Sequence, residues 1–241
     1  METHIALKPE IIDTLVGVPI SNSLVLSVLA GLFLVAVGFL GVRVLRAVPS
    51  KIQNAVELVI ESILNFMAGV LGSESNAKKF FPLVATLFLF ILFNNWIGVL
   101  PGTGSVEFRG EPLFRAANSD LNTTLALALI SVIAIQFYGI QKLGLLRHLS
   151  KFFVFTKGPI QFFVGILELI AEFAKILSFS FRLFGNVFAG EVLLLIVMGL
   201  APFLAPVPFF GLELFVGFIQ ALVFAMLTLI FLKIATEEVS H

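Results

Sequence analysis

Residues 160–204 decide the fold of this chain. They read IQFFVGILELIAEFAKILSFSFRLFGNVFAGEVLLLIVMGLAPFL, an apolar run that only sparse polar side chains interrupt. About 40 helical residues would extend about 60 Å, twice the hydrocarbon thickness of a bilayer, about 30 Å. An upright helix of this length would push apolar side chains into water. We therefore predict a membrane helix that is steeply tilted, curved or broken, with Gly185 and Gly190 allowing close packing or a bend.

Arg182 stands well inside this run, between two phenylalanines. An arginine keeps its proton in a protein, and a lone arginine at the bilayer centre costs roughly 2.5–3.5 kcal/mol on insertion scales. A counter-charge near Arg182 would offset this cost. The sequence therefore raises the question of which group supplies this counter-charge.

The composition places the chain in the membrane. Of its 241 residues, 59% are hydrophobic and 12% are charged, whereas soluble domains carry about 25% charged residues. Long apolar runs are typical of helices rather than of an outer-membrane barrel, so we predict an all-α integral membrane protein. The zero net charge gives no case for nucleic acid, and the three histidines lie outside the apolar runs. Without cysteine there is no thiol chemistry, and we expect no metal site, no cofactor and no cleavable signal at the N-terminus.

Five stretches are apolar enough to cross a bilayer: residues 22–42, 80–99, 121–140, 160–204 and 209–234. Residues 51–71 differ, because their apolar positions recur at helical spacing opposite a polar face. This pattern predicts an amphipathic helix that lies in the membrane interface or packs inside a complex. With a turn at 205–208, the last two membrane helices form a long tilted hairpin. We expect a single membrane domain over residues 1–241.

The positive charges of the loops predict the orientation. Nine of twelve loop cations lie on one side: Arg43, Arg46, Lys51, Lys78, Lys79, Lys142, Arg147, Lys151 and Lys157. The other three belong to the opposite side: Lys8, Arg109 and Arg115. Since cytoplasmic loops carry the excess of lysine and arginine, we expect the N-terminus outside, and the amphipathic helix and the C-terminus inside.

Most polar residues of the long run share one helical face. At about 100° per residue, five of them fall close to the direction of Arg182: Glu168, Glu172, Lys175, Ser178 and Asn186. Glu191 falls on the opposite face, so it is no simple partner of Arg182 within the helix.

Two carboxylates are predicted near the outer surface. Glu191 lies on the outer side of Arg182, and Glu213 comes early in the returning helix, at a similar depth. Gln220 lies deeper on the same face as Glu213, level with Arg182. Intramembrane carboxylates mark ion or proton pathways, and water has to reach them, because a buried unpaired carboxylate takes up a proton. We infer two aqueous half-channels that do not meet, with the fixed cation between them.

Each of these groups also has a structural interpretation. The three inner charges of the stripe lie near the membrane boundary, where charged side chains are ordinary. Asn186 and Gln220 can join helices by hydrogen bonds, Glu191 can be a structural hydrogen-bonding group, and Arg182 can form a structural ion pair. The asparagines at 94–95 are interpreted as a capped helix end, with an outer vestibule as the alternative.

The residues around the arginine resemble a known family. FRLFGNVFAGE (181–191) closely resembles the signature of the a subunit of rotary F-type ATP synthases, the stator half of the proton channel. Four further blocks look like family blocks in family order: NNWIGVLPG (94–102), SDLNTTLALAL (119–129), ILELIAEFAKILSFSFRLFGN (166–186) and GFIQALVFAMLTLIFL (217–232). The arginine block is the specific one, and the others support it.

This resemblance implies a role for each candidate residue. Arg182 matches the essential arginine, which faces a rotating ring of c subunits with membrane-buried carboxylates, so that its counter-charge is on another chain. Glu191 and Glu213 match positions of the outer half-channel. Asn186 and Gln220 match polar positions near the arginine. Glu168 and Lys175 match polar positions toward the inner pathway, and Glu172 lies on the same helical face as these two.

The resemblance also implies the setting. We expect the c-subunit ring, the b subunits of the peripheral stalk, other ATP synthase subunits and the lipid bilayer as partners, in an energy-coupling membrane such as the bacterial plasma membrane. The chain has no Walker-type phosphate loop, so we expect no ATP binding and no catalysis by the chain itself. Two other functions remain open: a secondary transporter whose arginine binds an anionic solute, although the repeats typical of such folds are not evident, and a scaffold subunit.

Overall fold

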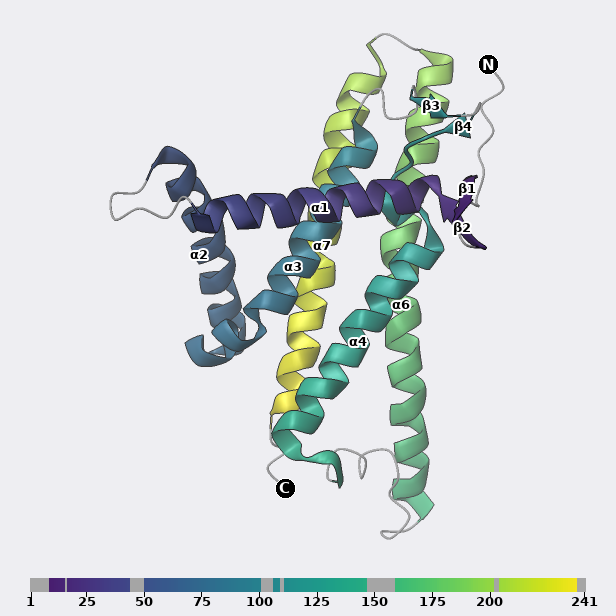
Figure 1. Ribbon diagram of the computed structural model, residues 1–241. Helices are drawn as coiled ribbons and strands as arrows, with labels where there is room; N and C mark the ends of the chain where they lie inside the picture. Colours follow the sequence, from purple (N-terminus) through teal and green to yellow (C-terminus); the bar gives the residue numbers. More distant parts are fainter. Residues whose placement is uncertain are drawn as a thin grey trace.

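The structure is a computed structural model that describes residues 9–15, 17–43, 50–100, 106–108, 111–146, 159–201 and 204–237. Six long helices make up most of this part of the chain (Figure 1): α1 (Asn22–Arg43), α2 (Lys51–Leu71), α3 (Glu74–Val99), α4 (Leu121–Leu143), α6 (Pro159–Leu200) and α7 (Pro206–Thr236). The smaller elements are two antiparallel hairpins and a 3-10 turn: β1 (Ile11–Leu15) with β2 (Val18–Ser21), β3 (Glu107–Phe108) with β4 (Glu111–Pro112), and η2 (Ala117–Ser119).

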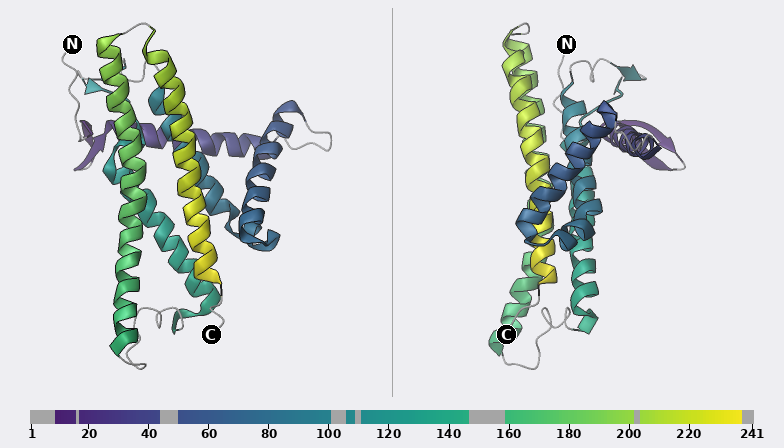
Figure 2. Two further views of the ribbon diagram at one scale, coloured as in Figure 1. Left: turned by 180° about the vertical axis from the view of Figure 1, so that it is seen from behind. Right: turned by 90° about the vertical axis from the view of Figure 1, so that its left-hand side faces the viewer.

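The longest helices, α6 and α7, form an antiparallel hairpin (Figures 1 and 2). They contain 42 and 31 residues, which correspond to about 63 and 46 Å at 1.5 Å per residue. The turn expected over 205–208 is wrong in part, because α7 already begins at Pro206. Proline suits the start of a helix, since its φ is preset and the missing N–H has no partner there in any case.

Helix α2 differs from the other five long helices in its polar face. All six are long and apolar enough to cross a membrane by length and composition. Helix α2, however, is capped by the side chain of Ser50 before its first residue and by Gly72, at φ +67°, after its last residue. Its exposed polar residues Asn54, Glu61 and Asn65 lie on the face away from the buried Met67 and Leu71. The fold is therefore all-α, with five transmembrane helices and one amphipathic helix, which confirms the predicted fold class.

Helix α1 runs crosswise to the α6–α7 hairpin (Figures 1 and 2). The two therefore cannot both stand upright in one bilayer. The 22 residues of α1 span about 33 Å, close to the hydrocarbon thickness, whereas α6 is about twice as long as the bilayer is thick. If α1 crosses the bilayer upright, the α6–α7 hairpin is the part of the protein that is tilted.

The interior lies where one face of α6 meets α3, α4 and α7. Leu183 of α6 is buried in one apolar cluster with Ile91 of α3, Leu127 of α4 and Phe224 of α7. A second cluster joins α2 to α3, α4 and α7. Because Leu183 turns inward, the adjacent Arg182 is directed to another side of α6, where it is exposed.

Candidate functional site

Arg182 lies on an open face of α6. Its Nη2 donates a hydrogen bond to the hydroxyl of Ser178, 3.2 Å away and one turn earlier. Phe181 beside it is more than half exposed, and Asn186, one turn later, is exposed as well. Within the described ranges Arg182 forms no ion pair. This part of the chain therefore leaves its cation unbalanced, on a surface that the other described residues do not cover.

The first half of the same helix carries a charge pair. Lys175 forms an ion pair with Glu172, and its ammonium lies 4.6 Å from the centre of the Phe231 ring on α7. The second carboxylate oxygen of Glu172 is buried and has no hydrogen-bond partner among the described residues. Glu168, one turn nearer the start of α6, is exposed. The polar residues of α6 thus divide into an ion pair that lies toward α7 and single groups on the exposed side of the helix that carries Arg182.

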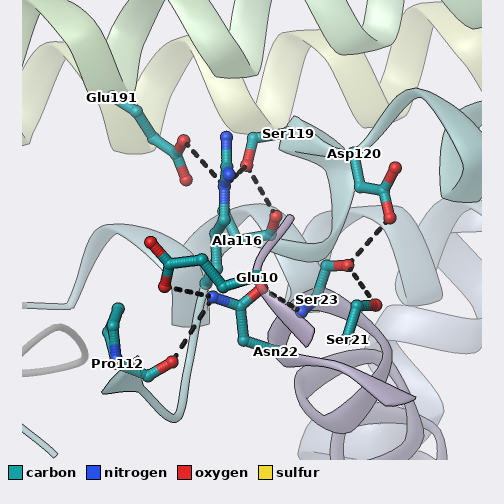
Figure 3. Close-up of polar contacts among 10 residues, drawn as sticks. Glu10, Ser21, Asn22, Ser23, Pro112, Ala116, Ser119, Asp120 and Glu191 are labelled. Atoms are coloured by element: carbon teal, nitrogen blue, oxygen red, sulfur yellow. Dashed lines mark hydrogen bonds and ion pairs between the residues drawn. The ribbon is translucent and has the colours of Figure 1, made fainter. Parts of the chain in front are cut away.

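At the other end of α6, Glu191 contacts the connection between α3 and α4. Its Oε2 lies 3.8 Å from Nε of Arg115 (Figure 3), with the two side chains 25% and 14% exposed. The same Nε donates to the hydroxyl of Ser119 at 3.2 Å. Glu191 therefore has a cationic partner inside its own chain, and a loop residue supplies it.

Glu213 of α7 lies against a glycine of α6. Its side chain is almost enclosed, at 8% exposure, and its carboxylate fills the space beside Gly190, where an added Cβ would overlap it. Gly190 directly precedes Glu191, and the carboxylates of Glu191 and Glu213 are close enough to interact electrostatically. The absence of a side chain at Gly190 is what lets a carboxyl group fit between the two helices.

A buried asparagine cluster lies one turn deeper along α7. Asn95 donates to the backbone oxygen of Gly217 at 2.9 Å and accepts from Asn118 at 2.7 Å. The interpretation of 94–95 as a capped helix end is wrong, because α3 continues to Val99 and both side chains are buried. Asn95 joins α3 to α7, whereas Asn94 donates to the backbone oxygen of Phe90 in its own helix at 2.8 Å. Among the described residues, the Oδ1 atoms of Asn94 and Asn118 have no hydrogen-bond partner, which is typical of sites that hold buried water.

Contacts at the first turns of α1 and α4 hold the connection between α3 and α4 in place. Asp120 caps α4 by accepting from the backbone of Asn122 at 2.9 Å, and it accepts from the hydroxyl of Ser23 at 2.8 Å (Figure 3). Asn22 reaches the backbone oxygen of Pro112 at 3.3 Å. These buried contacts attach the start of α1 to the loop that carries Arg115.

The eight predicted residues fall into separate groups in the structure. They are the exposed residues of α6 (Glu168, Arg182 and Asn186), the ion pair of α6 (Glu172 and Lys175), the two neighbouring carboxylates (Glu191 and Glu213), and the half-buried Gln220 on α7. Two residues of this region, Arg115 and Asn118, were not predicted as site residues. Arg115 was counted only as a loop cation. Arg115 could have been found as a cation on the same side as Glu191, but no periodic pattern singles out Asn118.

The fold and these groups define a class: a helical membrane protein with a tilted hairpin, which encloses carboxylates at one end and exposes an unbalanced arginine further along. Comparison with known proteins specifies it further. The family model described as ATP synthase A chain matches residues 24–233. The ATP synthase subunit a of Campylobacter jejuni subsp. doylei is 34% identical over 211 residues, which cover 86% of this chain and 87% of that protein. The ATP synthase subunit a of Geotalea daltonii is 37% identical over 207 residues, 85% of this chain and 83% of that protein.

The chain therefore belongs to the ATP synthase A chain family. Membership places it in ATP synthesis and proton transport, as an integral membrane subunit that works with other ATP synthase subunits.

Proposed function

We propose that this chain is the proton-channel stator subunit of a rotary F-type ATP synthase. It provides two offset half-channels and presents Arg182 to the carboxylates of a c-subunit ring. The observation that carries the proposal is the position of Arg182, exposed on α6 and without an ion pair in the described part of the chain. Because a cation at membrane depth is costly without a counter-charge, a partner has to supply one.

The outer half-channel delivers protons past Glu191 and Glu213. What supports this role is their proximity at the end of the hairpin and the packing of Glu213 against Gly190. Carboxylates reached by water exchange protons readily, whereas the apolar clusters around them do not conduct. The buried asparagines one turn deeper favour a hydrated continuation toward Gln220 and Asn186, since their unpaired oxygens suit bound water.

The ring carboxylate changes its charge as it passes Arg182. Beside the guanidinium, the charged form of a carboxylate is favoured, whereas lipid favours the neutral form. A proton from the outer half-channel neutralises the ring carboxylate, which then leaves Arg182 and rotates into lipid. The fixed charge of Arg182 repels protons that would pass directly from one half-channel to the other.

The inner half-channel receives the proton after the ring has turned. Glu168, Glu172 and Lys175 line it on the inward part of α6, with the N-terminus of the chain outside and its C-terminus inside an energy-coupling membrane. Each charge moved is worth about 2.3 kcal/mol per 100 mV. The b subunits of the peripheral stalk hold this chain still, so that the ring turns relative to it.

Replacement of Arg182 by alanine tests the proposal. In inverted vesicles with the assembled complex, Arg182→Ala should reduce ATP-driven proton pumping at least about 100-fold, because a positioned charge of this kind contributes about 10²–10³. Pumping is measured with a pH-sensitive dye and normalised to assembled complex. Lys78→Gln is the control, since it removes an exposed cation that pairs only locally with Glu74, and it should pump normally.

Intact pumping by Arg182→Ala would remove the proposal and leave the scaffold function. Uptake of an anionic solute that depends on Arg182, with ATP-driven pumping unaffected, would instead identify a secondary transporter.

A further inference from the structure

The connection between α3 and α4 takes part in the outer carboxylate site. Arg115 of this connection reaches across to α6, where its Nε lies 3.8 Å from Oε2 of Glu191. The guanidinium is 14% exposed, so it is largely removed from water. An ion pair shielded in this way interacts more strongly than a pair on a free surface.

The position of Arg115 is fixed by its own loop. Its Nε donates to Ser119 at 3.2 Å, and the hydroxyl of Ser119 donates to the backbone oxygen of Ala116 at 2.8 Å. Ala116 in turn packs so closely on α3 that a Cβ added at Gly98 would overlap it. The cation therefore approaches Glu191 from a packed loop, through a single contact at its Nε.

Two opposite charges act on the carboxylate of Glu191. Arg115 attracts it from the loop, Glu213 repels it from α7, and the hydroxyl of Ser119 lies on the side of Arg115. These are the charged groups that face it from the elements packed around it in the described part of the chain. Both forces turn Glu191 toward the loop and away from Glu213.

We infer that Arg115 is a positioning residue for proton uptake: it holds the carboxylate of Glu191 at the outer end of the site, apart from that of Glu213. The two acids then act one after the other instead of sharing one proton. This inference rests on the proposed outer half-channel. It adds the α3–α4 connection to α6 and α7 as a third element that lines this half-channel.

A double-mutant cycle tests the inference in the assembled complex. Arg115→Met, Arg115→Lys, Glu191→Gln and the double variant Arg115→Met/Glu191→Gln are compared in inverted vesicles by ATP-driven proton pumping per assembled complex. Arg115→Met should slow pumping about 5- to 20-fold, since it leaves a partly buried carboxylate unpaired. Arg115→Lys should recover to within about twofold of the native rate, because the contact with Glu191 is a contact of charges through one atom pair, and lysine keeps the charge. In the Glu191→Gln background, Arg115→Met should add no further loss, because the two residues act as one unit.

The outcomes separate this inference from the proposed function. A full native rate in Glu191→Gln would refute the proposed role of Glu191 in the outer half-channel. A slow Glu191→Gln with a normal Arg115→Met would overturn only the role of Arg115. Additive losses in the double variant, or a lysine variant as slow as the methionine variant, would also overturn it. Lys78→Gln again serves as the control, because it breaks an exposed ion pair.

Loss of assembly in Arg115→Met would still be decisive. If the unpaired carboxylate causes that loss, then Glu191→Gln in the same chain removes the charge and should restore the complex. Failure of the double variant to assemble would show that Arg115 supports the loop independently of Glu191, and the inference would be wrong.

Discussion

Two regions of the α6–α7 hairpin differ in whether their charged groups have partners within the chain. Near the turn between the two helices, Glu191 pairs with Arg115, and Glu213 is enclosed against Gly190. Along the middle of α6, Arg182 is exposed and has only the hydroxyl of Ser178 as a hydrogen-bond partner in the described part of the chain. In the first region, residues of the same chain supply the partners. In the second region, the described part of the chain supplies no counter-charge for Arg182.

This difference indicates where the partner binds. The chain pairs Glu191 with one of its own cations. It could likewise pair Arg182 with one of its own carboxylates, because α6 carries acidic residues. Instead, the exposed neighbours of Arg182 are apolar or lack a side chain, as Phe181, Gly185 and Ala189 show. Such a surface suits lipid or another helix rather than water. The enclosed end should therefore tolerate little change in shape, and the open face little change in charge.

The largest effect in the enclosed end is expected from a single methyl group. Gly190→Ala places a Cβ where the carboxylate of Glu213 lies, and the flexible side chain of Glu213 has to swing away. A displacement of about 1 Å can cost a rate of about 10²-fold, so we expect proton pumping to fall about 10- to 100-fold. Assembly should be unaffected, because alanine is the better helix former by about 1 kcal/mol.

Gly199→Ala is the matched control for this change. It lies on the same helix, and an added Cβ there meets nothing within 4 Å. In a Glu213→Ala background, Gly190→Ala should have no further effect on pumping. Equal losses from both glycine variants would mean that helix flexibility, rather than the space for Glu213, matters.

A smaller effect, on stability rather than rate, is expected from the asparagine cluster. Asn95→Ala removes the hydrogen bonds to Gly217 and Asn118 and leaves buried polar groups unpaired, which costs about 1–3 kcal/mol. The purified complex should dissociate at a lower temperature, and subunit release on heating measures this shift. Asn76→Ala, at the exposed start of α3, should leave the temperature unchanged. An unaltered transition in Asn95→Ala would show that water replaces the lost side chain.

The difference between the two regions also explains what could be predicted from the sequence. Hydropathy and helical spacing suffice for the class of fold and for the stripe around Arg182, because both are properties of single helices. The proximity of Glu191 and Glu213 requires only that two consecutive helices run antiparallel. These features depend on local order along the chain, which the sequence contains directly.

Contacts that join distant segments could not be predicted in this way. Arg115 reaches Glu191 only because the α3–α4 connection packs on the hairpin, and Asn95 bonds to Gly217 across 122 positions of the chain. The β1–β2 hairpin before α1 was not expected either, since its short strands lack a clear alternating pattern. A glycine such as Gly190 carries no sign of the side chain that fills its space.

The smallest effect is expected on the open face, at its inner end. Glu168 is exposed and forms no ion pair within the described ranges, while the neighbouring Glu172 pairs with Lys175. Since exposed charges interact weakly, Glu168→Gln should slow pumping by about two- to fivefold. Glu172→Gln should slow it more, because it leaves Lys175 beside the Phe231 ring without its anion. Pumping by both variants in the same vesicles tests this order, and the reverse order would make Glu168 the principal acid of the inner pathway.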